Sequence, residues 1–141
     1  MKTNRIRPFT ISGFTIMMVL SSATLIRCSS DEGPDQTSSF VGTYTVEEID
    51  PITKDVEHTY DIFISKISST EIDIDNFRYF VVPIRATVSG NNMTIKPESF
   101  TQGKVTIDIT GSGKLENDEL AYSYTLTGYI NVTAFCVATK K

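Results

Sequence analysis

Beyond residue 40, apolar and polar residues alternate along most of the chain, and this period of two is typical of strands with one buried face. The alternation is clearest between residues 70 and 77, where isoleucines and acidic residues take turns. In this segment one face carries Ile72 and Ile74, and the other carries Glu71, Asp73 and Asp75. The region shows no period of 3.6, the mark of an amphipathic helix.

About eight strands are expected, separated by turn residues such as Asp50-Pro51 and Ser89-Gly90-Asn91-Asn92. Pro83 marks an edge, a bulge or a bend in the fourth strand, and Gly111-Ser112-Gly113 predicts a bulge in the sixth. The expected strands span residues 40–49, 57–68, 70–77, 79–88, 92–97, 104–110 with 114–115, 119–127 and 129–139. The pattern predicts an all-β domain, an antiparallel up-and-down meander that forms a barrel or a two-sheet sandwich.

The first 27 residues have the composition of an export signal that forms an N-terminal signal helix. Lys2, Arg5 and Arg7 supply positive charge, and residues 11–26 are apolar apart from Ser, Thr and Gly. Cys28 lies at the end of this segment, where a lipoprotein signal places the cysteine that takes the lipid. We therefore expect residues 1–27 to be a lipoprotein signal peptide and Cys28 to be lipidated.

Two other outcomes stay open for this segment, because Arg27 stands where a lipoprotein signal usually has Gly, Ala or Ser. Ordinary cleavage after Ser21-Ser22-Ala23 would release a secreted or periplasmic protein. Without cleavage, residues 8–26 are about long enough to span a bilayer as a helix. The lipid anchor is thus the first of three alternatives.

Residues 28–39 are rich in Ser, Gly, Pro and acids, a composition that predicts a flexible tether between an anchor and a folded domain. Ser29, not Asp, follows the cysteine, which resembles sorting to the outer membrane. Asp31 and Glu32 resemble a surface-export signal, although solvated linker charges explain them equally well. The expected location is the outer membrane or cell surface, with residues 40–141 as the folded domain.

The charge of the exported part argues against nucleic acid as a partner. From Cys28 onward the chain has nine basic and 17 acidic residues, a formal charge of −8. Such a surface repels phosphate backbones and anionic lipid headgroups. The surface of the domain is therefore not expected to bind the membrane. The membrane is expected as a partner only through the N-terminal lipid anchor.

Candidate catalytic or metal-binding residues are few, and each has a simpler structural explanation. His58 is the single histidine, and Cys136 lies between two apolar residues, which favours a buried structural thiol. The acidic residues at 71, 73 and 75 offer oxygen ligands for calcium, but no Gly-containing loop follows to wrap the ion. We therefore expect the protein to have no catalytic residue, no bound metal and no cofactor. We do not expect it to be an enzyme.

Inward-pointing aromatic residues are the best candidates for a binding site. A barrel of this size is either just filled by side chains or has room for one small ligand. The aromatic residues are therefore expected to line a small-ligand site or, as the simpler alternative, to pack as core. The candidate ligand-lining residues are Tyr44, Tyr60, Tyr122 and Tyr124, with Phe63, Tyr79 and Phe80 as further aromatic candidates.

Four short motifs also resemble those of a family. They are Gly42-Thr43-Tyr44, Val88-Ser89-Gly90-Asn91, Gly111-Ser112-Gly113 and Cys136-Val137-Ala138-Thr139-Lys140. In these motifs the chain resembles small bacterial lipoproteins with a lipocalin-like β domain, over residues 40–141. The resemblance implies a lipocalin-like barrel, and most such proteins have no assigned activity. Where relatives have a second cysteine in the first strand, this chain has Glu47-Glu48-Ile49, which implies that Cys136 is free.

The expected function is that of a lipid-anchored cell-envelope protein that binds a small apolar or sugar-like ligand or an extracellular partner. The alternative is a structural or inhibitory interaction module with a filled barrel. In that case the exposed loops 50–55 and 100–104 would contact another protein. An open, aromatic-lined cavity would favour ligand binding, whereas a filled interior would rule out ligand binding and favour the interaction module.

Overall fold

The structure is a computed structural model that describes residues 33–141, and it consists of eight strands and one short 3-10 turn. Within this range no helix is long and apolar enough to cross a membrane. The predicted signal helix and Cys28 lie outside the described residues. The elements are β1 (Gly42–Ile49), β2 (Val56–Lys66), β3 (Glu71–Asp75), η1 (Phe77–Tyr79), β4 (Ile84–Ser89), β5 (Asn92–Gln102), β6 (Val105–Glu116), β7 (Glu119–Gly128) and β8 (Val132–Lys140).

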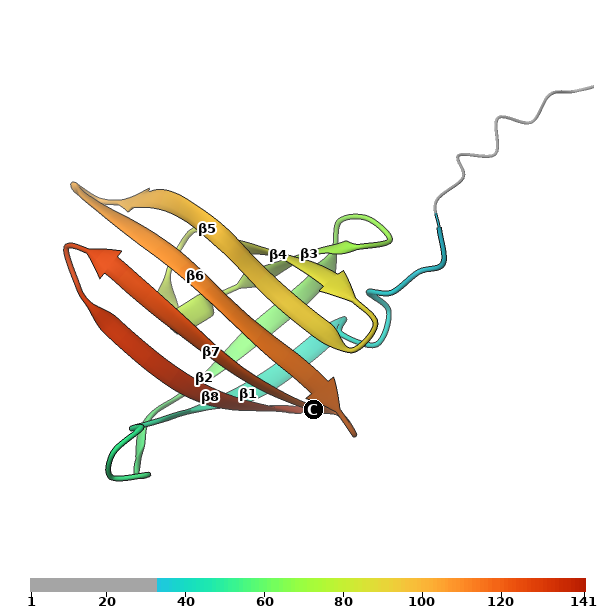
Figure 1. Cartoon of the computed structure of the whole chain (residues 1–141), viewed down its shortest axis with the longest axis horizontal. Coiled ribbons are helices and arrows are strands. Elements are labelled where there is room, and N and C mark those ends of the chain that lie inside the picture. Colours follow the sequence, from blue (N-terminus) through green and yellow to red (C-terminus); the bar gives the residue numbers. More distant parts are fainter. Residues whose placement is uncertain (1–32) are drawn as a thin grey trace, which may run out of the picture. The chain divides into compact units, whose positions relative to one another are not determined.

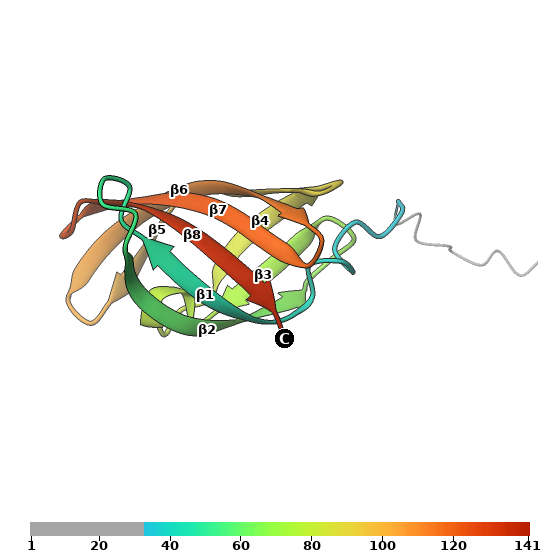
Figure 2. The same cartoon turned by 90° about the horizontal axis from the view of Figure 1, so that it is seen from below.

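Each strand pairs with its neighbours in sequence and β8 pairs with β1, so the sheet closes into a barrel (Figure 1, Figure 2). The closing ladder runs from Tyr44 opposite Lys140 to Ile49 opposite Phe135. The predicted all-β up-and-down meander is confirmed, and the barrel rather than the sandwich is the architecture. Closure pairs the edge strands with each other and so protects them from other chains.

Alternate residues of the strands point into the barrel and form one hydrophobic core. In β1 the inward residues are Tyr44, Val46 and Glu48, which the strand period places two positions apart. Isoleucine is the commonest inward residue, and full burial of one such side chain stabilises the fold by about 1.5–3 kcal/mol. The buried isoleucines are Ile62, Ile64, Ile72, Ile74, Ile84, Ile95, Ile107 and Ile109.

The segment before β1 closes one end of the barrel. Phe40 is fully buried, and its carbonyl oxygen accepts a hydrogen bond of 2.9 Å from the hydroxyl of Tyr44. Thr37 is also buried, and its hydroxyl donates to the carbonyl of Ser68, in the turn between β2 and β3, at 3.2 Å. These contacts hold part of the predicted tether against the barrel.

An ion pair supports the same end, because the Asp35 carboxylate lies 2.8 Å from the ammonium of Lys66. We call this end, which also holds the turns β2–β3, β4–β5 and β6–β7, the N-terminal end of the barrel. The opposite end holds loops 50–55, 103–104 and 129–131, and we call it the loop end (Figure 1).

A gap in the barrel wall lies beside the first half of β2, because β3 is short and pairs with the second half. Residues 76–83, here called the wall segment, fill this gap. The side chain of Asn76 donates to the carbonyl of Asp61 at 2.6 Å, and the hydroxyl of Tyr79 donates to the carbonyl of Thr59 at 3.1 Å. Side-chain hydrogen bonds thus take the place of a strand ladder here.

Two predicted boundaries near the loop end are wrong. The strand expected over residues 79–88 begins at Ile84, because Arg78 and Tyr79 have φ values of +46° and +62°, which an extended strand does not allow. The loop expected over residues 100–104 is reduced to two residues, since β5 continues to Gln102.

The bulge expected at residues 111–113 is also misplaced. The ladder between β6 and β7 continues in register through this segment, and the register shift lies in β5 between Ile95 and Glu98. Pro97 falls within the shifted stretch, and a proline cannot donate a hydrogen bond to the ladder. The proline, not the glycine pair, therefore marks the irregular strand.

Gly111 and Gly113 instead allow β6 and β7 to approach closely. A Cβ atom on Gly113 would lie 2.5 Å from Cβ of Tyr122, and one on Gly111 would lie 2.6 Å from the carbonyl oxygen of Ser123. Both glycines stand opposite the inward tyrosines of β7. Their missing side chains therefore leave the space in which Tyr122 and Tyr124 pack.

Candidate functional site

A carboxylate buried inside the barrel is the centre of the candidate site. The side chain of Glu48 on β1 is 1% exposed. Its Oε2 accepts a hydrogen bond of 2.9 Å from the hydroxyl of Tyr124 on β7, and its Oε1 lies 3.3 Å from Nη2 of Arg78. A buried carboxylate is costly unless it is paired, so one inside an otherwise apolar core is a candidate for function.

Strand register places two more polar groups beside Glu48. Glu48 stands opposite Cys136 in the β1–β8 ladder, and Cys136 stands opposite Tyr122 in the β7–β8 ladder. Opposite residues in antiparallel strands carry their side chains on the same face of the sheet. Glu48, Cys136 and Tyr122 therefore form a row across the inner wall of the barrel.

Arg78 reaches this row from the wall segment. Its left-handed backbone, with φ +46° and ψ +40°, is an uncommon and strained conformation for a residue with a side chain. The side chain is 20% exposed, and its Cζ lies 6.0 Å from the centre of the Tyr124 ring. The ion pair with Glu48 and the burial of Phe77 and Phe80 on either side offset this strain.

Aromatic rings form a packed group next to the ion pair, which the ring of Tyr124 contacts. Phe77 packs against Tyr122 and Tyr124, with ring centres 5.9 Å and 4.9 Å away. Phe80 packs against the half-buried Phe100 with ring centres 4.9 Å apart. Such rings exclude water with their apolar bodies and attract cations with their faces.

Several buried polar atoms of this region have no hydrogen-bond partner among residues 33–141. They are Oε1 of Glu48, Oη of Tyr60, Nη1 of Arg78, Oη of Tyr122 and, in β5, Oε1 of Gln102. An unpaired buried polar group costs about 1–3 kcal/mol, and most such groups in proteins are paired. These atoms therefore have hydrogen-bonding capacity that a bound molecule can use. We call Glu48, Tyr60, Arg78, Tyr122, Tyr124 and Cys136 the interior polar cluster.

Burial keeps the thiol and the hydroxyls of this cluster protonated. It raises the pKa of Cys136 from 9.0 to about 12, and the charge of Glu48 acts in the same direction. Burial likewise raises the pKa of Tyr60, Tyr122 and Tyr124. Because a thiolate is the nucleophilic form of cysteine, burial disfavours nucleophilic chemistry at Cys136.

The structure brings three of the four candidate ligand-lining tyrosines together. Tyr60, Tyr122 and Tyr124 belong to the interior polar cluster, whereas Tyr44 lies toward the N-terminal end, where it bonds to Phe40. All four are buried and inward, as the strand period predicts. Their role in ligand binding stays a prediction.

The further aromatic candidates differ in position. Phe63 is 51% exposed and faces away from the core, and Phe80 is buried. Tyr79 is 58% exposed, but its ring packs against that of Tyr60 with ring centres 5.3 Å apart. Cys136 is buried and free within residues 33–141, as predicted. His58 is exposed on β2. The described part of the chain groups no three His, Cys, Asp or Glu side chains that could hold a metal ion.

Sequence reasoning missed Glu48 and Arg78. Glu48 follows Tyr44 and Val46 at the inward positions of β1, so its phase in the strand was a usable signal. Arg78 lies outside the strands, and the sequence pattern carries no signal for its inward direction.

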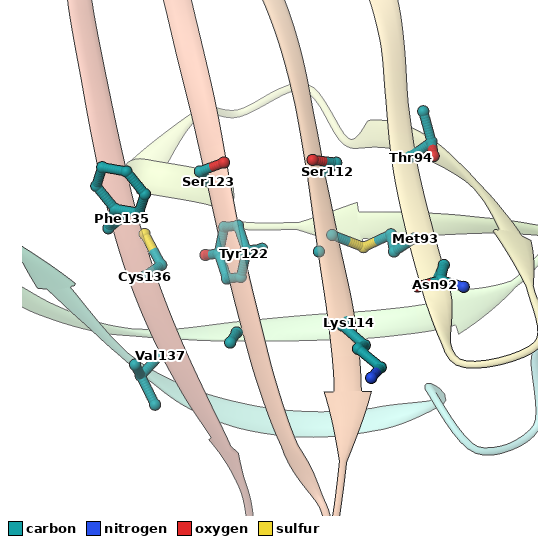
Figure 3. Close-up of a pocket in the computed structure, with 12 residues that line it drawn as sticks. Asn92, Met93, Thr94, Ser112, Lys114, Tyr122, Ser123, Phe135, Cys136 and Val137 are labelled. Carbon is teal, nitrogen blue, oxygen red and sulfur yellow. The ribbon is translucent and has the colours of Figure 1, made fainter.

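A hollow lies on the outer side of strands β5 to β8 (Figure 3). It has a volume of about 530 Å³ and is open to solvent, and its lining includes Ser112, Ser123 and the half-exposed Phe135. A smaller hollow of about 170 Å³ lies beside Arg85 and Glu98. Neither hollow of the described barrel is lined by the Glu48–Arg78 pair, so a ligand must displace side chains to reach that pair.

Comparisons with protein-family models, curated proteins and solved structures found no match to this chain. The closed barrel of eight antiparallel strands is compatible with a lipocalin-like fold. Only the residues of the site therefore indicate what the barrel does.

Proposed function

We propose that this protein is a lipid-anchored protein of the bacterial cell envelope whose barrel binds a small molecule in its interior. The observation that carries the proposal is the buried Glu48 carboxylate, surrounded by polar atoms of which several lack a partner among the described residues. Small-molecule sites combine an apolar, aromatic lining with a few polar groups that fix orientation. The interior polar cluster and its neighbouring phenylalanines supply both.

The wall segment is the part of the barrel that can make room for a ligand. Its contact with β2 depends on the side chains of Asn76 and Tyr79, and Arg78 and Tyr79 have left-handed backbones. Segments held by few backbone hydrogen bonds open more easily than the strands around them. Outward movement of Phe77 and Phe80 would leave an aromatic-lined space beside Glu48.

The proposed anchor and the proposed site lie toward opposite ends of the barrel. Residues 35–40 pack against the N-terminal end, so a lipid on Cys28 would tether that end to the membrane. Glu48 is the penultimate residue of β1, on the side of the loop end. The site would thus face solutes outside the membrane, and the acidic domain would not adhere to anionic headgroups.

Binding in the interior is tested with N-phenyl-1-naphthylamine, a neutral probe whose fluorescence rises in a dry environment. Phe80→Ala removes a ring from the wall segment and should raise the affinity for the probe. The matched control Phe135→Ala removes a ring from the outer hollow and should leave the affinity unchanged. If Phe135→Ala abolishes probe binding, the probe occupies the outer hollow and the interior site is wrong.

The anchor is tested by growing cells that express the full chain with labelled palmitate. The wild-type chain should incorporate the label, and Cys28→Ala should not. Incorporation that persists in Cys28→Ala would contradict lipidation at this residue. Release of the wild-type protein into the soluble fraction would favour cleavage after residues 21–23 instead.

A second candidate function is an interaction module with a filled barrel. Two observations favour it: neither of the two hollows described above reaches the Glu48–Arg78 pair, and apolar loop residues are exposed. Ile52 is 88% exposed in loop 50–55, and Tyr129 is 73% exposed in loop 129–131. Apolar side chains gathered at one end of a domain can mark a contact surface for another protein. This candidate predicts no probe in the barrel, and loss of cross-linking to a partner in cells when Ile52 is changed to Ser.

A further inference from the structure

We propose that the ligand of the barrel is a small organic cation, an amine or guanidine with an apolar or aromatic body, which takes the place of Arg78 beside Glu48. The inference depends on the interior binding proposed above and specifies the chemistry of the ligand. It narrows the small apolar or sugar-like ligand that the sequence led us to expect to one that carries a positive charge.

The two partners of the buried ion pair are held very differently. Glu48 lies on β1, which has a ladder with β2 on one side and with β8 on the other, and Tyr124 donates a hydrogen bond to Oε2. Arg78 belongs to the wall segment, has a strained backbone and keeps 20% of its side chain exposed. The carboxylate is therefore fixed, and the cation is the partner that can be exchanged.

The pair between Glu48 and Arg78 is also incomplete. A well-formed arginine–carboxylate pair has two parallel N–H···O hydrogen bonds. Here Nη2 lies 3.3 Å from Oε1, and neither Oε1 nor Nη1 has a hydrogen-bond partner in the described part of the chain. A ligand cation that donates directly to Oε1 would make a better bond than Arg78 does.

The groups around Glu48 suit a cation with several N–H donors. The hydroxyl groups of Tyr60 and Tyr122 interact with each other and with the Cys136 thiol, but neither makes a well-formed hydrogen bond within residues 33–141, and their oxygens can accept one. The ring of Tyr124 lies against the guanidinium of Arg78, and Phe77 packs on the same ring. Ring faces attract cations, and the attraction grows when water is excluded. The place of Arg78 is therefore already built for a positive charge.

Charge balance argues against other ligands at this position. A neutral molecule that displaced Arg78 would leave a buried carboxylate without a counter-charge, which is strongly unfavourable. An anion would add a second negative charge beside the first. The formal charge of −8 on the exported part would also draw cations toward the domain.

The experiment compares three probes with the same benzyl body by calorimetry on the full chain. Benzylguanidinium is a cation, benzylurea is its neutral analogue of similar shape, and phenylacetate is an anion. In Arg78→Met the guanidinium that competes with the ligand for Glu48 is gone. Benzylguanidinium should therefore bind this variant at least roughly tenfold more tightly than benzylurea does. It should also bind this variant at least roughly tenfold more tightly than it binds the wild-type chain. The double variant Glu48→Gln with Arg78→Met should lose this preference. The control Arg85→Met removes an exposed arginine that pairs with Asp73 and should behave as the wild type.

The outcomes separate this inference from the function on which it depends. If benzylurea binds Arg78→Met as tightly as benzylguanidinium, the cation assignment is overturned while interior binding stands. If no benzyl probe and no N-phenyl-1-naphthylamine binds any variant, both proposals are wrong. If Arg78→Met does not fold in buffer, recovery of folded protein with benzylguanidinium but not with benzylurea supports the inference. Recovery with neither, or with both equally, contradicts it.

Discussion

The hydroxyl of Tyr124 on β7 donates a hydrogen bond of 2.9 Å to Oε2 of Glu48 on β1, although β8 lies between the two strands. Both side chains are almost completely buried, so the carboxylate cannot turn to water instead. The bond leaves Oε1 facing Arg78. The orientation of the buried charge is therefore set by a residue 76 positions away in the sequence.

Tyr124→Phe should lower the free energy of unfolding by about 2 kcal/mol, because hydrogen bonds to charged groups contribute about 1.5–3 kcal/mol. The ring and its packing on Phe77 are kept, so the change isolates the hydroxyl. Urea unfolding of both proteins measures the difference. Tyr129→Phe, on an exposed ring, is the matched control and should change the stability little. Equal losses in the two variants would contradict the assigned bond.

Changing Arg78 and changing Glu48 should lower the free energy of unfolding by different amounts. Arg78→Ala leaves the Glu48 carboxylate buried without a counter-charge and should cost about 3 kcal/mol of stability. Glu48→Gln should cost less, about 1 kcal/mol, because the amide oxygen can still accept from Tyr124. Arg78, being 20% exposed, can turn toward solvent in that variant. Urea unfolding of the two single variants and of the double variant measures these losses and the coupling between the two residues. A larger loss of stability in Glu48→Gln than in Arg78→Ala would contradict the prediction.

Most of the barrel could be predicted because its strands follow the period of two closely. The inward phase of Tyr60, Tyr122 and Tyr124 is visible in the sequence, and all three are buried. The closure of β1 onto β8 could not be distinguished from a sandwich, since both architectures bury alternate residues. Register between distant strands, which brings Glu48 next to Cys136, leaves no local pattern.

The polar half of the site was harder to predict for a different reason. Glu48 has the inward phase, but a glutamate is almost never fully buried unless it is paired, and its partner lies far away in the sequence. Arg78 points inward because its backbone and that of Tyr79 are left-handed, a conformation that sequence does not favour for either residue. The wall segment thus depends on tertiary contacts, such as Asn76 with the carbonyl of Asp61, rather than on local preference.

Gly113→Ala should destabilise the barrel by about 1–3 kcal/mol, because added groups in a packed region force backbone or side-chain shifts. The new Cβ atom would lie 2.5 Å from Cβ of Tyr122 and 2.9 Å from the carbonyl oxygen of Ala121. Thermal unfolding followed by circular dichroism gives the loss. Ser112→Ala changes an exposed position between the two glycines and should have little effect. An unchanged melting temperature in Gly113→Ala would show that β6 and β7 do not need their close approach.

Stability should fall at alkaline pH because buried groups hold their protons more tightly in the folded state. Burial raises the pKa of Cys136 from 9.0 to about 12 and that of Tyr44 from 10.0 to about 12. Above pH 9 the unfolded chain releases protons that the folded chain keeps, so these contributions are complete below pH 9 and are lost progressively toward pH 12.

Cys136→Ala should therefore flatten the decline in the free energy of unfolding between pH 9 and pH 10. In this range the unfolded chain begins to lose the proton of the Cys136 thiol, whereas the Tyr44 hydroxyl loses its proton at higher pH. Val137→Ala removes a side chain from the next position on β8 without removing a titratable group, and it is the control for lost packing. Urea unfolding at a series of pH values measures the slope. Equal slopes in Cys136→Ala and Val137→Ala would mean that the thiol does not couple protonation to folding.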